Sequence, residues 1–147
     1  MGIARRHIEA VDLIITVWDG VIDPAAWSRA VDGEVAAPAS AQANRRLTDA
    51  RTADSSAVTY ADVEAMAANL SGLSVDLTRV RLAIVATTGW QTAQHFEVSM
   101  RKYGVTTVVF TDIHTACAWL GVDAPFTLAI VDEMREELRD DGVPRPI

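Results

Sequence analysis

The densest group of polar side chains in the sequence lies between residues 49 and 56: Asp49, Arg51, Asp54, Ser55 and Ser56. A serine flanked by charges can accept a phosphate, which would add about −1.5 to −2 charges at that point. The same residue types also suit a turn, in which aspartate pairs with arginine and serines bind backbone groups. The residue types alone favour the structural role, and we keep these five residues as candidates for binding a partner or ligand.

Four tryptophans form the second notable group. Trp18 and Trp90 both lie next to the ends of predicted strands, where they could line a pocket for an apolar ligand. Trp27 and Trp119 lie on predicted helices, where packing against a sheet is the ordinary role of an indole ring. Trp18 and Trp90 are therefore the stronger candidates for ligand contact.

No arrangement of side chains in the sequence predicts catalysis. His7, His95 and His114 are too widely spaced to form a triad or a metal cluster, and Cys117 lies on the apolar face of a predicted helix. The HExxH, GxSxG, GxGxxG and Walker patterns are absent. The turn at residues 87–90 could receive an anion at a helix N-terminus, but we favour the simpler interpretation that Thr88 caps the helix. We expect no enzymatic activity, no metal and no cofactor.

Composition narrows the class of protein further. The chain of 147 residues carries 13 basic and 20 acidic side chains, a net charge of −7, and a single cysteine. Nucleic-acid binding needs a basic surface, so this balance argues against it and against binding to anionic membranes. One cysteine excludes an internal disulfide, and no segment reaches the roughly 18 apolar residues of a membrane span. We expect a cytoplasmic protein.

The hydrophobic pattern predicts alternating strands and helices. Strands are predicted at residues 11–18, 46–51, 80–86 and 105–110, with a shorter hairpin partner at 5–9. Helices are predicted at residues 24–35, 59–70, 88–103, 113–120 and 123–140. Three of them have cap signals at their starts: Asp23 before Pro24, a capping box of Thr59 and Asp62, and Asp112. The continuous apolar run at 80–86 indicates a strand covered on both faces, and we expect it at the centre of the sheet. The acidic residues between 132 and 141 are expected on the solvent face of the last helix.

This order of elements predicts an α/β fold with a single small mixed sheet of about 4–5 strands and helices packed mainly on one face. Residues 1–147 are expected to form one domain, with 1–4 and 142–147 flexible and 123–140 as a C-terminal helix. Ligands of such sheets favour the carboxyl ends of the strands, which here are followed by residues 49–56, 87–90 and 111–114.

The pattern resembles the STAS-like domains, in the branch of the sporulation anti-anti-sigma factor. The resemblance rests on residues 12–20 (DLIITVWDG), on 47–52 (LTDART) and on 107–120, where a strand and Asp112 lead into ACAWL. It implies a phosphoacceptor at Ser55 or Ser56, although Ala57 stands where that family has glycine. The broader fold is also similar to CRAL-TRIO lipid-transfer domains, which implies an apolar ligand between sheet and helices.

Two functional hypotheses follow. The first is a non-enzymatic STAS-like interaction or regulatory module that binds a protein partner through residues 49–56 and the adjacent helix. The alternative is a carrier or binder of a small apolar or amphiphilic ligand, held between helices and sheet and contacting Trp18 and Trp90. A homodimer formed through the exposed first strand is a further expectation.

Overall fold

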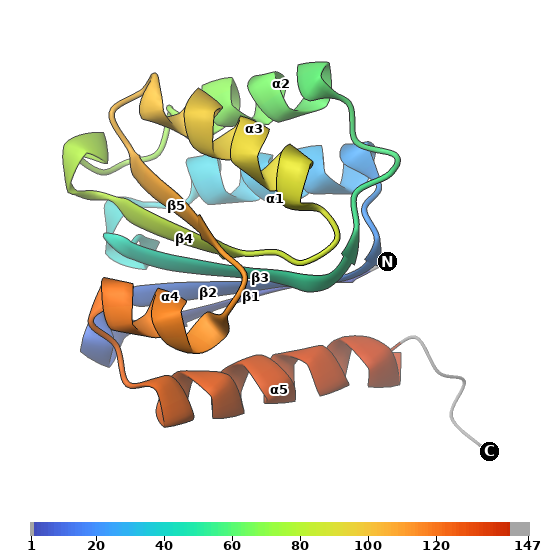
Figure 1. The fold of residues 1–147 in the computed structure, drawn as a ribbon. Helices are drawn as coiled ribbons and strands as arrows, with labels where there is room; N and C mark the ends of the chain where they lie inside the picture. The colour runs from blue at the N-terminus through green and yellow to red at the C-terminus, as the bar shows by residue number, and fades with distance from the viewer. Residues whose placement is uncertain (1, 142–147) are drawn as a thin grey trace.

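The computed structural model describes residues 2–141, which form five strands and five α-helices around one mixed sheet (Figure 1). The strands are β1 (Gly2–Ile8), β2 (Leu13–Val21), β3 (Arg45–Asp54), β4 (Arg81–Val85) and β5 (Thr106–Phe110). The helices are α1 (Pro24–Ala36), α2 (Tyr60–Leu70), α3 (Trp90–Arg101), α4 (Ile113–Leu120) and α5 (Ala124–Asp141). Short 3-10 turns occupy Glu9–Val11, Ala39–Ala41 and Leu77–Arg79.

The strands lie in the order β1-β2-β3-β4-β5. The β1–β2 pair is antiparallel, and the other three pairs are parallel. The predicted mixed sheet is therefore confirmed. The prediction that residues 80–86 form its centre is wrong, because β3 is central and Leu47 lies opposite both Ile15 and Ala83. Residues 2–4, which we expected to be flexible, pair with β2, and residues 1 and 142–147 lie outside the described residues.

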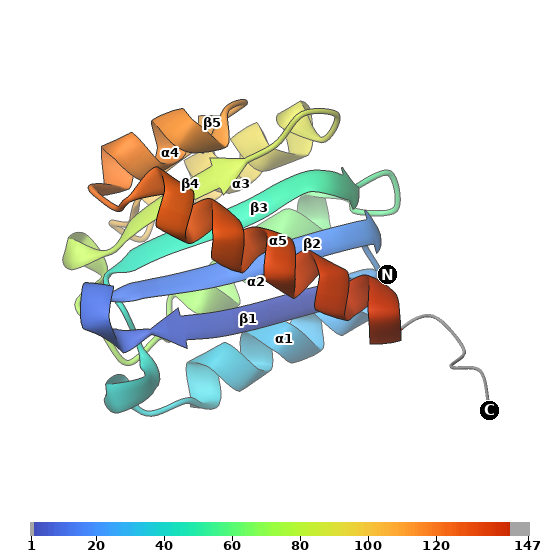
Figure 2. The same cartoon turned by 90° about the horizontal axis from the view of Figure 1, so that it is seen from below.

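Helices cover both faces of the sheet. Figure 1 shows α1, α2 and α3 on one side and α4 and α5 on the other, and Figure 2 shows α5 running obliquely across the strands. Alternation along each strand divides the side chains between the two layers. On β4, Leu82 and Ile84 belong to the cluster under α1–α3, whereas Ala83 and Val85 belong to the cluster under α4 and α5.

The helix starts follow local sequence signals. Asp23 caps α1 with Pro24 at the first position, and Asp112 caps α4 through the amide of His114. Thr59 and Asp62 form the predicted capping box of α2. These three caps agree with the sequence prediction. The α3 helix differs, because it begins at Trp90 and its N-cap residue is a glycine without a side-chain bond.

Candidate functional site

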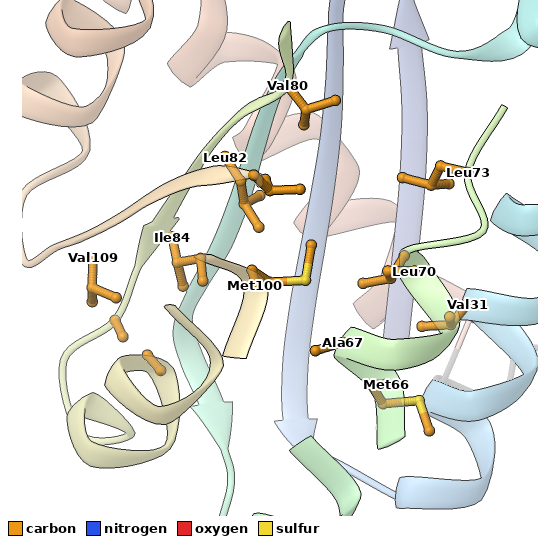
Figure 3. Packing of buried hydrophobic residues seen from close by; sticks show 13 residues of the cluster. Val31, Met66, Ala67, Leu70, Leu73, Val80, Leu82, Ile84, Met100 and Val109 are labelled. Carbon is orange, nitrogen blue, oxygen red and sulfur yellow. The ribbon is translucent and has the colours of Figure 1, made fainter. Parts of the chain in front are cut away.

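A cavity of about 160 Å³ lies between the sheet and the helices α1–α3. Its walls are mostly apolar. Figure 3 shows Leu82 and Ile84 of β4, Val80 just before that strand, and Leu70 of α2, Leu73 and Met100 in the same layer. An engineered apolar cavity of about 150 Å³ in another protein binds benzene, so this volume suits a ligand of about six carbon atoms.

Small residues on facing elements account for the space. Ala30 of α1, Ala50 of β3 and Ala93 of α3 all line the cavity. Protein interiors otherwise pack as densely as organic crystals, and larger side chains at these positions would fill the gap. The opposite layer under α4 and α5 contains Leu13, Ile15 and Leu47, which are fully buried and do not line this cavity.

Aromatic rings form one part of the cavity wall. Trp18 is 6% exposed, and its ring meets that of Trp27 edge to face with the centroids 5.8 Å apart. The ring of Phe96 lies 5.8 Å from Trp27, and all three residues line the cavity. Trp90 packs beside the same apolar cluster but is not one of the residues that line the cavity. The two candidate tryptophans therefore have different surroundings.

A group of charged and polar side chains lines a second part of the wall. Arg46 of β3 is 7% exposed, and its Nη2 donates to Oε1 of Gln42. Its Nη1 lies 3.6 Å from Oε1 of Glu34, which also accepts a hydrogen bond of 3.0 Å from Nε of Arg5. The Nε of Arg46 is buried and has no hydrogen-bond partner among the described residues. Burial lowers the pKa of Arg46, Glu34 raises it and Arg5 lowers it further.

Ser55 belongs to the cavity wall near the carboxyl ends of the strands. Its Oγ lies 3.3 Å from Oγ1 of Thr92, and both residues line the cavity together with Gly89. A Cβ at Gly89 would come within 2.9 Å of the Ser55 Oγ, so a larger residue at this position would require the Ser55 hydroxyl to shift. The structure thus brings Ser55 and Trp18, two of the candidates from the sequence, to the same cavity.

Asp49 and Arg51 lie instead on the opposite face of β3, where Asp49 is completely buried. Arg51 Nε donates to Asp49 Oδ1 over 2.9 Å, and Arg135 of α5 donates to Asp49 Oδ2. Burial alone would raise the pKa of Asp49, but the hydrogen bonds from both arginines outweigh it and lower the pKa below its ordinary value. This ion-pair group connects β3 with α5.

The remaining serine and aspartate candidates face solvent. The prediction that residues 49–56 form a loop is wrong for its first part, because β3 continues to Asp54. Asp54 and Ser56 are exposed, and Asp54 Oδ1 accepts a hydrogen bond of 2.9 Å from the Ser56 amide. The segment 111–114 leads into α4 on the other face of the sheet, so the three expected loops do not form one crevice.

The other potentially reactive groups in the described residues are separate from the cavity. Cys117 is buried under α4, where burial raises the pKa of its thiol. Within residues 2–141, no cluster of three or more His, Cys, Asp and Glu side chains is arranged to hold a metal ion. No helix in this part of the chain combines the length and apolar character needed to cross a membrane.

Comparison with known proteins identifies the fold class of the chain. Neither models of protein families nor curated sequences match the chain. Among solved structures, it is similar to an uncharacterised protein of the DUF3478 family with a SpoIIAA-like fold from Shewanella loihica PV-4. The TM-score is 0.51 at 16% identity, over 81% of this chain and 92% of that one. The chain therefore has a SpoIIAA-like, that is STAS-like, α/β fold, as the sequence resemblance predicted.

The sequence prediction missed Arg46, Gln42 and Glu34. Arg46 precedes Leu47 in β3, and a polar residue beside an apolar one is typical of a strand with one solvent-facing side. The second layer of helices turns that side inward and buries the guanidinium. No local signal distinguishes a buried arginine of this kind from an exposed one, so only the packing of α1 over the sheet reveals the group.

Proposed function

We propose that this protein is a non-enzymatic STAS-like module that binds a small apolar or amphiphilic ligand between the sheet and α1–α3. The observation that carries the proposal is the cavity of about 160 Å³ with mostly apolar walls. An apolar ligand would restore the dispersion contacts that the lining side chains lack and would be removed from water. The proposal concerns binding, because the described residues of the cavity wall offer apolar, hydroxyl, carboxylate and guanidinium groups, and the carboxylate of Glu34 is paired with Arg5 and Arg46.

The position of the cavity supports this function. The cavity extends along the sheet from Arg46 to Ser55 and Trp18, which lie toward opposite ends of their strands. A ligand held there would contact strands and helices that come from most of the chain. Binding would then stabilise the whole domain, because a ligand specific for the folded state lowers its free energy by mass action. We also propose a cytoplasmic location, in keeping with the single buried thiol of Cys117.

Replacing Ala93 with leucine should block the cavity. Ala93 lies on α3 and lines the cavity, so the added carbons would occupy the space that a ligand needs. We expect the affinity for hexan-1-ol to fall at least about tenfold, the equivalent of about 1.4 kcal/mol. Isothermal titration calorimetry on protein refolded from denaturant, which removes ligands acquired in the cell, measures this change.

The matched control is Ala65→Leu, which makes the same change on the exposed face of α2. This variant should bind hexan-1-ol as the unmodified protein does. Native mass spectrometry of the purified, unrefolded protein provides a second measurement, in which a bound small molecule supports the proposal. Unchanged affinity in Ala93→Leu, or no binding of hexan-1-ol to the unmodified protein, would contradict it.

A second candidate function is the binding of a protein partner near Ser56. The observation that favours it is a continuous exposed surface at the start of α2, where Ser56 and Ala57 are exposed and Tyr60 is 57% exposed. We infer that Ser56 is a better phosphoacceptor than Ser55, whose hydroxyl points toward Thr92. A phosphate there would stand beside Asp54 and repel an acidic partner. Self-association through the open edge of β1 stays a prediction.

The partner hypothesis is tested with Ser56→Asp, Ser56→Ala and the control Ser40→Asp, another exposed serine. Crosslinking in cell extract followed by quantitative mass spectrometry measures which proteins each variant captures. We expect Ser56→Asp to lose at least about 90% of a partner that Ser56→Ala and Ser40→Asp retain, because the added negative charge repels an acidic partner. A tenfold loss of affinity corresponds to about 1.4 kcal/mol. Equal capture by all three variants would refute the phosphorylation switch.

A further inference from the structure

The charges along the cavity wall are unbalanced. Arg5 and Arg46 both face one carboxylate, that of Glu34. The Arg5 Nε lies 3.0 Å from Glu34 Oε1, within hydrogen-bond distance, whereas the Arg46 Nη1 lies 3.6 Å from the same oxygen. Glu34 therefore forms its hydrogen bond with Arg5, and this group retains one positive charge in excess.

That excess charge lies on the more deeply buried guanidinium. The side chain of Arg46 is 8% exposed against 29% for Arg5. The Nε2 of Gln42 donates a hydrogen bond of 2.7 Å to the carbonyl oxygen of Glu34. This bond fixes the amide group so that its Oε1 accepts from Arg46. Within residues 2–141 the Arg46 Nε still lacks a partner, although buried donors are nearly always satisfied in folded proteins.

We infer that the ligand of this cavity is an anionic amphiphile, whose carboxylate accepts a hydrogen bond from Arg46 Nε while its hydrocarbon part lies among the apolar side chains. This inference rests on the proposed function and names its ligand class. An arginine stays charged even when buried, and a carboxylate is the anion that matches its planar donors. The carboxylate of one bound ligand would accept a hydrogen bond from the Arg46 Nε. Together with Glu34 it would also balance the positive charges of Arg5 and Arg46.

The end of the cavity near Glu34 adjoins the surface of the protein. A hollow on the surface is lined by Ile3, Arg5, Ala30, Gly33 and Glu34. Arg5, Ala30 and Glu34 also line the inner cavity, so the Arg5–Glu34 ion pair lies between the two spaces. A ligand that arrives there meets Arg5 first and then Arg46, which favours an anion over a cation.

The test compares three probes of equal chain length at pH 7: hexanoate, hexan-1-ol and hexylammonium. Isothermal titration calorimetry on refolded protein measures each affinity. We expect hexanoate to bind at least about tenfold more tightly than hexan-1-ol and hexylammonium to bind most weakly, since hydrogen bonds to charged groups are the stronger ones. In Arg46→Met the preference for hexanoate should disappear while hexan-1-ol still binds. The control Arg29→Met removes an exposed arginine of α1 and should leave the preference unchanged.

The outcomes separate this inference from the proposed function. If hexan-1-ol binds but hexanoate binds no more tightly, or if Arg46→Met keeps the preference for hexanoate, the cavity binds ligands and the role of Arg46 is refuted. If none of the probes binds, the proposed function fails and the inference fails with it. The comparison of probes on the unmodified protein decides the matter even where Arg46→Met does not fold.

Discussion

Replacing Asp49 with asparagine is expected to lower the free energy of unfolding by about 3–5 kcal/mol, because the change removes a completely buried carboxylate that lies between two arginines. Asparagine has the shape of aspartate, so the decrease in the free energy of unfolding measures the removal of the charge and not the creation of a cavity. Without the carboxylate, Arg135, which is 9% exposed, keeps a buried charge. The contact between β3 and α5 should weaken first. Urea denaturation followed by tryptophan fluorescence measures the change.

The matched control is Asp132→Asn, which removes an exposed carboxylate 3.8 Å from the same arginine. Its effect should stay below about 1 kcal/mol, as for other exposed ion pairs.

The stability in acid provides a second check. The pKa of Asp49 is lowered in the folded state, so its stabilisation is complete above the unfolded value of about 3.9 and is lost as the pH falls through the folded value. The difference between Asp49→Asn and the unmodified protein should therefore shrink in strong acid. Equal effects of the two substitutions at pH 7 would refute the role of Asp49.

Replacing Leu47 with alanine is expected to lower the free energy of unfolding by about 3–5 kcal/mol. Leu47 lies on the central strand, is completely buried and packs in the layer under α4 and α5. Its neighbours on the adjacent strands, Ile15 and Ala83, belong to the same layer. Because backbone hydrogen bonds hold the strands at fixed spacing, this layer cannot collapse into the space left by the deleted carbons. Thermal and urea denaturation measure the loss.

The comparison with Leu82→Ala tests whether the two layers differ in packing. Leu82 lies on β4 and lines the cavity under α1–α3, so one side of its side chain already faces empty space. Fewer dispersion contacts are lost on truncation, and we expect a smaller cost of about 2–3 kcal/mol. Refolded protein is used for both variants, since a bound ligand would add to the cost of Leu82→Ala. A larger loss for Leu82→Ala than for Leu47→Ala in ligand-free protein would contradict the cavity.

The helix caps and the strand order along the chain could be predicted because their causes are local. Asp23 with Pro24, Thr59 with Asp62, and Asp112 each bind or favour backbone within a few residues. The alternation of apolar residues likewise predicted most strands and the mixed sheet. The position of each strand within the sheet could not be predicted in this way. The apolar run at 80–86 indicated burial on both faces, but it did not indicate that the strand lies next to the edge of the sheet.

The candidate site could be predicted only in part. Trp18 and Ser55 do line the cavity, whereas Asp49 and Arg51 lie on the other face of the sheet. The prediction placed Asp49 in a loop because the polar run that begins there resembles a turn. In the structure β3 continues past it, and Arg135, distant in the sequence, supplies the charge that allows a carboxylate to be buried.

By itself, the sequence determined the α/β class, the order of the elements, the caps and the STAS-like resemblance, since these depend on residue types and on spacings within one strand or helix. Only the tertiary structure decided which face of β3 meets which helices, and with that the location of the cavity and the burial of Arg46 beside Glu34. The physical reason is that burial and charge pairing depend on residues brought together by long-range packing. The local sequence around Arg46 and Leu47 is the same whether Arg46 meets water or a second layer of helices.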